Sequence, residues 1–181
     1  HRHDVYDAYK ATRKKIDDAL IAQLIRSKDI FIALNIPIYE AKGFEADDVL
    51  GTIVEKLKEK NGREIVIASG DMDTLQLVSG KKVQAYTLRK GINDTMIYDE
   101  DAVKARFGFG PELLPDYKGL RGDPSDNIIG VPGIGEKTAT ELIQKFGSIE
   151  DIYEKIKKDE AGMIGGAVKA RMIELLKTHE E

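Results

Sequence analysis

Hydrophobic and polar residues alternate along the chain in two different ways, and these patterns predict helices and strands in turn. Apolar residues recur at helical spacing from about Lys15 to Leu34 and again from about Glu45 to Lys60. The runs "IPIYEA", "EIVIAS", "KVQAYT" and "TMIYD" have the apolar or alternating composition of strands. Because strands alternate with helices, the sequence predicts an α/β fold with a mainly parallel sheet flanked by helices.

The strand signals end at about residue 100, and only short helices are expected after it. Their apolar spacing predicts helices over about 100–107, 111–120, 136–146, 149–157 and 167–177. The change predicts two domains, an α/β core over residues 1–100 and a helical region over residues 101–181.

Composition excludes several classes of site. The chain has 181 residues with 41% hydrophobic content, which is enough for a packed core. It contains no cysteine, so disulfides and thiolate zinc sites are excluded. No apolar run is long enough to span a membrane, so we expect a cytoplasmic protein without a membrane partner.

Three acidic residues crowd the start of the second predicted helix, in "GFEADDVL". They are Glu45, Asp47 and Asp48. Acids in a first turn favour the helix dipole, which explains Glu45 and Asp48. The apolar stripe of this helix, followed back toward its start, passes through Asp47 and predicts that its side chain points inward. An inward carboxylate needs a partner, so this group is a candidate functional site.

Two more acidic pairs each have a structural and a functional interpretation. Asp71 and Asp73 follow a predicted buried strand, where open α/β sheets place ligands, but Asp73 with Gln76 also fits a helix capping box. A D-x-D pair in this place is also typical of some phosphatases. Asp123 and Asp126, in "RGDPSDNIIG", fit a carboxylate site or a turn that their own side chains stabilise.

Taken together, the three groups predict a metal site. Seven carboxylates without a nearby cysteine or histidine form an all-oxygen ligand set, which suits Mg²⁺ or Mn²⁺. Two such ions can promote a phosphoryl displacement. The net charge is −4, and without the seven site charges the remainder is +3, so a nucleic-acid partner is compatible with the rest of the surface.

A glycine-rich stretch, "NIIGVPGIGEKTATELI", directly precedes a predicted helix. Glycines let backbone N–H groups approach an anion, and a helix N-terminus favours one. The pattern resembles the helix-hairpin-helix element that holds a DNA phosphate backbone without reading its sequence. An ordinary turn between helices is the alternative. The residues expected to contact DNA here are Gly130, Val131, Gly133, Ile134, Gly135, Lys137 and Thr138.

Three long segments together resemble one family. "FEADDVLG", "ASGDMDTLQLV" and "GLRGDPSDNIIGVPGIGEKTATELI" have the order and spacing of the 5′→3′ exonuclease domain of bacterial DNA polymerase I, in the flap endonuclease family. "HRHDVYDAYKATR" is similar to the start of that family's helical arch. The resemblance implies a PIN/5′-nuclease-like core followed by a helical region with an H3TH-type helix-hairpin-helix.

The resemblance also implies a function and its residues. It implies a structure-specific 5′ nuclease of replication and repair that cuts DNA at a 5′ flap or 5′ end with two Mg²⁺ or Mn²⁺ ions. The first ion would be held mainly by Glu45, Asp47, Asp48 and Asp71. The second would be held by Asp73, Asp123 and Asp126.

The arch residues Lys10 and Arg13 would contact the scissile phosphate and, with Asp47 and Asp71, form the catalytic set, while Tyr9 would bind DNA. The resemblance further implies a K⁺ ion at the hairpin, a polymerase domain or a polymerase in trans, a monomer, and a place at the bacterial nucleoid.

Two departures from the family keep an alternative open. Met72 stands where the family usually has a lysine between the two aspartates. The family's first strand, with one essential aspartate, and a second aspartate before the arch would lie upstream of His1. We therefore expect either a fragment or a degenerate relative, and the alternative function is a non-catalytic module that binds DNA junctions.

Overall fold

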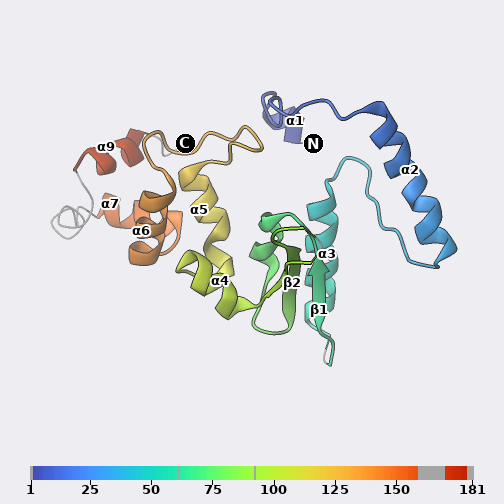
Figure 1. Cartoon of the computed structure of the whole chain (residues 1–181). Coiled ribbons are helices and arrows are strands. Elements are labelled where there is room, and N and C mark those ends of the chain that lie inside the picture. The colour runs from blue at the N-terminus through green and yellow to red at the C-terminus, as the bar shows by residue number, and fades with distance from the viewer. Residues whose placement is uncertain (1, 61, 92, 159–169, 179–181) are drawn as a thin grey trace. The chain divides into compact units, whose positions relative to one another are not determined.

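The computed structural model describes residues 2–60, 62–91, 93–158 and 170–178 (Figure 1). These residues form two compact units. The first unit comprises His1–Ile53 and Ser125–Asn127, and the second comprises Val54–Pro124 and Ile128–Glu181. The described elements, in chain order, are α1 (Arg2–Val5), α2 (Asp18–Ala33), α3 (Ala46–Lys58), β1 (Ile65–Ala68), η1 (Met72–Leu77), β2 (Val83–Leu88), β3 (Thr95–Tyr98), α4 (Glu100–Phe107), η2 (Pro111–Leu113), α5 (Leu114–Arg121), α6 (Glu136–Phe146), α7 (Ile149–Lys157) and α9 (Ala170–Thr178).

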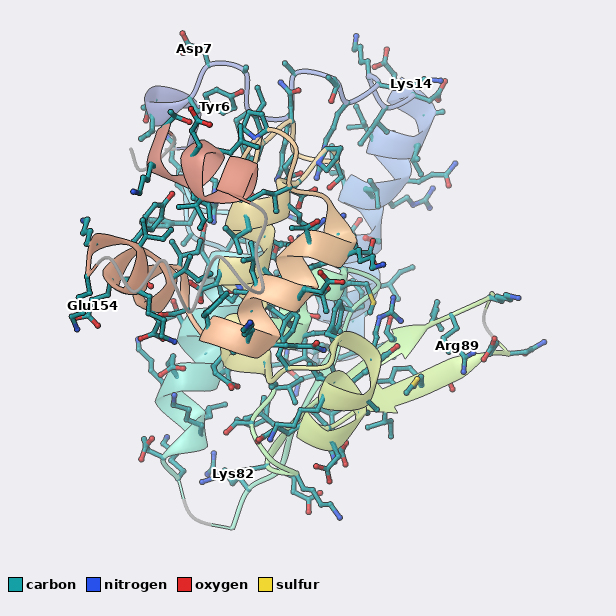
Figure 2. All side chains as sticks on the ribbon, turned by 90° about the vertical axis from the view of Figure 1, so that its left-hand side faces the viewer. Tyr6, Asp7, Lys14, Lys82, Arg89 and Glu154 are labelled. Carbon is teal, nitrogen blue, oxygen red and sulfur yellow. The ribbon has the colours of Figure 1, made fainter. Side chains whose placement is uncertain are left out.

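The sheet of the second unit has the strand order β1-β2-β3. β1 pairs with β2 in parallel and β2 pairs with β3 antiparallel, so the sheet is mixed. Alternate residues of β2, Val83, Ala85 and Thr87, are buried, as a half-buried strand requires. Figure 2 shows Arg89 toward the tip of the β2–β3 hairpin. The three predicted strands in this part of the chain, and the α/β class, are confirmed.

The helical cluster follows the sheet, as predicted, and Figure 1 shows α5, α6, α7 and α9 gathered together. The buried residues of α6 are Ala139, Leu142 and Ile143, whose spacing places them on one helical face. α7 begins with a capping box between Ser148 and Asp151. The first part of the predicted helix over 167–177 lies outside the described residues.

The connection between α5 and α6 brings two backbone segments into close approach. A Cβ added at Gly130 would lie 2.1 Å from the backbone nitrogen of Gly122, so only glycine fits there. The N–H of Val131 donates a hydrogen bond to the Leu120 carbonyl at 2.9 Å. Glycine is therefore required at this crossing by packing of the backbone itself.

The first unit departs from the sequence prediction at one strand. Residues 36–41, predicted as a strand, have no regular secondary structure. A strand needs a hydrogen-bonded neighbour, and Pro37 lacks an N–H. The preceding helix is confirmed as α2, but none of its residues is buried. Among the described residues no helix is long and apolar enough to cross a membrane.

Candidate active site

The predicted carboxylates are divided between the two units, and each group is described within its own unit. The first unit contains Glu45, Asp47, Asp48 and Asp126. The second unit contains Asp71, Asp73 and Asp123. The expectation that all seven form one metal-binding cradle stays a prediction.

Tyr9 links two of the carboxylates in the first unit. Its ring is buried, with 5% of the residue exposed. The hydroxyl oxygen lies 3.1 Å from Glu45 Oε2 and 3.0 Å from Asp126 Oδ2, so it can donate a hydrogen bond to either. Burial raises the pKa of Tyr9 above its ordinary value, and the hydroxyl therefore remains a donor at neutral pH.

The two predicted arch cations bind these same carboxylates. Lys10 Nζ donates a hydrogen bond to Glu45 Oε2 at 2.7 Å and lies 3.9 Å from Asp126 Oδ2. Arg13 Nη2 donates to Asp126 Oδ1 at 2.5 Å. Burial alone would raise the pKa of Glu45, but the hydrogen bonds from Lys10 and Tyr9 and the charges of Lys10 and Arg2 together outweigh it and lower that pKa. The structure thus brings Tyr9, Lys10 and Arg13 together with two predicted metal ligands.

Arg2 is a partner that sequence reasoning missed. It binds Asp48 with both terminal nitrogens, at 2.9 and 2.8 Å, and lies 3.5 Å from Glu45 Oε2. The bond from Arg2 lowers the pKa of Asp48. Asp48 also accepts the N–H of Glu45 at 2.9 Å, which stabilises the start of α3. No sequence signal marks the Arg2 contact, because its partner lies far along the chain.

Asp47 was expected to point inward, with Glu45 and Asp48 beside it. In the structure Asp47 is half-buried, and so are Glu45 and Asp48. The three side chains therefore fall in the same class of exposure. The predicted stripe continues along α3 to Val54, which is buried.

In the second unit, Asp71 rather than Asp73 caps the helical turn. Its side chain accepts a hydrogen bond from the N–H of Asp73 at 3.0 Å at the start of η1. The structural alternative, a capping box with Asp73 as N-cap and Gln76, is therefore wrong, because η1 begins at Met72, two residues earlier than that motif requires. The carboxylate of Asp73 takes a different partner.

Lys118 joins Asp73 and Asp123. Its Nζ donates a hydrogen bond to Asp123 Oδ2 at 2.8 Å and a second one to Asp73 Oδ1. Burial by itself would lower the pKa of Lys118, but the bonds to Asp123 and Asp73 outweigh it and raise that pKa. Met72 packs against the hydrophobic core. The positive charge beside these carboxylates is therefore supplied by α5, which sequence reasoning did not identify.

The donor set fits a divalent cation chemically. All the predicted ligands are carboxylates, which are the oxygen donors that Mg²⁺ and Mn²⁺ prefer. Within each unit, the described residues show no group of three or more acidic or histidine side chains arranged as a metal site. Lysine and arginine side chains instead neutralise Glu45, Asp48, Asp73, Asp123 and Asp126.

The glycine hairpin presents backbone and charge at the start of α6. Gly135 is the N-cap residue and makes no side-chain capping bond, and Lys137 is exposed in the first turn. The side chain of Ile134 is buried in the core, with 4% of the residue exposed. Ile134 can therefore contact a ligand only through its backbone.

Comparisons with known proteins cover the chain from end to end. A family model described as "5'-3' exonuclease, N-terminal resolvase-like domain" matches residues 1–108. A second, described as "5'-3' exonuclease, C-terminal SAM fold", matches residues 109–181. DNA polymerase I of Caldicellulosiruptor bescii is 43% identical over 160 residues, which are 87% of this chain and 18% of the relative. The chain thus spans less than a fifth of that relative's length.

Two solved structures of the D15 protein of phage T5 share the fold. The T5 D15 protein co-crystallised with metal ions has a TM-score of 0.76 and 26% identity, over 99% of this chain and 66% of that one. A complex of the T5 D15 flap endonuclease with DNA and metal ions has a TM-score of 0.72 and 25% identity, over 98% of this chain and 64% of that one. The fold is therefore that of a resolvase-like core followed by a helical SAM-fold region.

Proposed function

Because the chain belongs to the 5′-3′ exonuclease family, as the exonuclease domain of DNA polymerase I does, we propose that it is a structure-specific 5′ nuclease. It hydrolyses DNA phosphodiesters at a 5′ flap or a 5′ end beside a duplex, in replication and repair. The substrate is consistent with the DNA and metal ions in the related T5 complex.

One observation carries this proposal. Glu45 and Asp126, predicted as metal ligands, share Tyr9 and Lys10 as partners, and Asp126 also binds Arg13; all three partners were predicted as DNA-binding residues. A nuclease needs carboxylates for cations and basic groups for the phosphate in one place. The first unit supplies both kinds of group in a single cluster.

The metal ions fit the carboxylate set, and we assign them to it. The carboxylates that would hold the ions are Glu45, Asp47, Asp48 and Asp126 in the first unit and Asp71, Asp73 and Asp123 in the second. Bound Mg²⁺ or Mn²⁺ would supply the Lewis acidity needed to activate a water and to stabilise the leaving oxygen.

The side chains of the chain itself prepare the substrate. Lys10 and Arg13 orient the scissile phosphate and neutralise charge that builds up on it. Both are already held beside carboxylates, so their conformations are restricted before DNA binds. Tyr9 remains a hydroxyl donor between Glu45 and Asp126.

The hairpin before α6 binds the part of the duplex that lies at a distance from the cleaved phosphodiester. The predicted DNA contacts here are Gly130, Val131, Gly133, Ile134 and Gly135, together with Lys137 and Thr138. The N–H groups of Val131 and Ile134 donate to the carbonyls of Leu120 and Val131, so the glycines would supply the N–H groups for the phosphates. Backbone carbonyls of this hairpin would hold a K⁺ ion, whose charge would add to the attraction for the phosphates. A polymerase domain in the same protein, or a separate polymerase, would then synthesise DNA across the gap that cleavage leaves.

The test is cleavage of a labelled 5′-flap DNA by the full gene product, with and without Mg²⁺ or Mn²⁺. We expect cutting only with the metal, and we expect Asp71→Ala to abolish it while flap binding, followed by fluorescence anisotropy, is retained. Asp29→Ala, which changes an exposed aspartate of α2, is the matched control and should cut normally.

Two results would contradict the proposal in different ways. Full cutting by the Asp71→Ala variant would remove the metal assignment. Tight flap binding without any cleavage by the full gene product, at every metal concentration, would instead favour the non-catalytic junction-binding module.

A further inference from the structure

Two residues of the first unit share a backbone conformation that L-amino acids rarely adopt. Lys10 has φ +56° and Asn127 has φ +59°. The left-handed region is disfavoured by contacts of Cβ for residues other than glycine, although asparagine tolerates it better than most. Neither residue is glycine, so the surrounding contacts must hold both in place.

Those contacts run directly between the two segments. Asn127 Nδ2 donates a hydrogen bond to the Ala8 carbonyl at 2.7 Å. The Tyr6 hydroxyl donates to the Asn127 carbonyl at 3.2 Å, and the Lys10 N–H donates to the Asp126 carbonyl at 2.9 Å. Figure 2 shows Tyr6 in the turn after α1, with Lys14 farther along the same segment. The backbone of the segment is therefore held by hydrogen bonds at Ala8 and Lys10, on the two sides of Tyr9.

The side chain of Asn127 binds backbone and does not take part in the charged cluster. Its amide reaches the Ala8 carbonyl, whereas Glu45 and Asp126 take their bonds from Tyr9, Lys10 and Arg13. The proposed function uses Lys10 and Arg13 on the phosphate and gives Asn127 no role. What the amide fixes is the path of the chain two residues before Lys10.

We infer that Asn127 is a positioning residue: its side-chain amide holds the backbone of the segment that presents Lys10 to the scissile phosphate. This inference rests on the proposed function, because it needs Lys10 to act on DNA. An asparagine meets two requirements here, since it accepts the left-handed backbone and it supplies an N–H donor that glycine and aspartate lack.

The test is a double-mutant cycle between Asn127 and Lys10, measured by single-turnover cleavage of 5′-flap DNA by the full gene product with Mg²⁺. Asn127→Gly keeps the backbone conformation and removes the amide, so we expect a cleavage rate lower by roughly tenfold. In the Lys10→Ala background the same change should alter the rate by less than about twofold, because the positioned group is gone. Asn127→Asp should behave as Asn127→Gly does.

The control is a second left-handed asparagine. Asn35 has φ +55° and lies outside the charged cluster, so Asn35→Gly should leave the rate unchanged. Thermal unfolding of each variant detects a loss of fold. The coupling between Asn127 and Lys10 in the mutant cycle detects a loss of positioning.

Three outcomes would overturn the inference. A normal rate for Asn127→Gly removes it, and so does a loss that is equally large with and without Lys10, since Asn127 would then act by another route. A normal rate for Lys10→Ala removes the role proposed for Lys10 and the inference with it. Failure of the proposed role of Lys10 can therefore be distinguished from failure of the inference about Asn127 alone.

Discussion

Lys118 offers the sharpest test of how the second-unit carboxylates are neutralised. Its ammonium group binds both Asp73 and Asp123, and the exposed fractions of the three side chains are 34%, 31% and 13%. Replacing it by methionine, as Lys118→Met, keeps most of the side-chain volume and removes the charge. Two carboxylates then lie close together without a cation, which destabilises the fold when no divalent ion is present.

The magnitude follows from the partial exposure of the pair. Fully exposed ion pairs contribute less than about 1 kcal/mol, whereas breaking a buried pair costs about 3–5 kcal/mol. For this half-exposed bridge we expect a loss of about 1–2 kcal/mol in unfolding free energy, or roughly 2–8 °C in Tm. Because its pKa is raised, Lys118 is charged at neutral pH, and a divalent ion must displace it.

The same substitution should therefore strengthen metal binding. If the displaced bridge is worth about 1–2 kcal/mol, Mn²⁺ should bind the Lys118→Met variant about 5–30-fold more tightly. Thermal unfolding by circular dichroism, with and without Mn²⁺, and Mn²⁺ binding by electron paramagnetic resonance measure the two effects. Lys104→Met, which removes a surface pair with Glu100, is the control and should change neither by a comparable amount.

The reasoning would be refuted by one combination of results. If Lys118→Met lowers the Tm equally with and without Mn²⁺, and Mn²⁺ affinity is unchanged, Lys118 and the ion do not share Asp73 and Asp123.

Three further predictions concern other parts of the chain. Gly130→Ala should lower the unfolding free energy by about 1–3 kcal/mol in denaturant titrations, because the new Cβ would lie 2.1 Å from a backbone nitrogen. Gly70→Ala is the control, since a Cβ there would have no atom within 4 Å, and an equal effect of both would contradict the packing argument. The pKa of Glu45 is lowered on folding, so its bond to Lys10 stabilises above the ordinary glutamate pKa and is lost as pH falls through the lowered value. The protection factors for amide exchange of the segment around Lys10, corrected for the intrinsic exchange rate, should fall with pH over that range, and a flat profile would count against it. Flap binding should weaken steeply with salt, and Lys137→Ala should reduce the slope of log affinity against log salt by about 1; an unchanged slope would exclude Lys137 from the phosphate contacts.

Local patterns in the sequence predicted most of the secondary structure. The strands β1, β2 and β3 and the helices α3, α4, α6 and α7 lie where apolar spacing placed them, within a few residues. Such patterns succeed because alternation and helical spacing report the burial of one face, which is a local property. The strand expected over residues 36–41 failed because a strand also needs a neighbour, and a pattern cannot supply one.

The candidate site divides in the same way. The sequence alone predicted the candidate carboxylates, because their types and their places after strands and at helix starts are visible in it. It could not identify what compensates their charge. Arg2 reaches Asp48 and Lys118 reaches Asp73 across more than forty residues of chain, and only folding brings such groups together.

The sequence by itself determined the kinds of chemical group and the local elements that carry them, since both depend on residue type and short-range spacing. The tertiary structure decided the partners: Tyr9 between Glu45 and Asp126, Lys118 across two aspartates, and Asn127 on the backbone of a distant turn. The physical reason is that hydrogen bonds and ion pairs depend on distances of a few ångströms, which the chain sets only after it has folded.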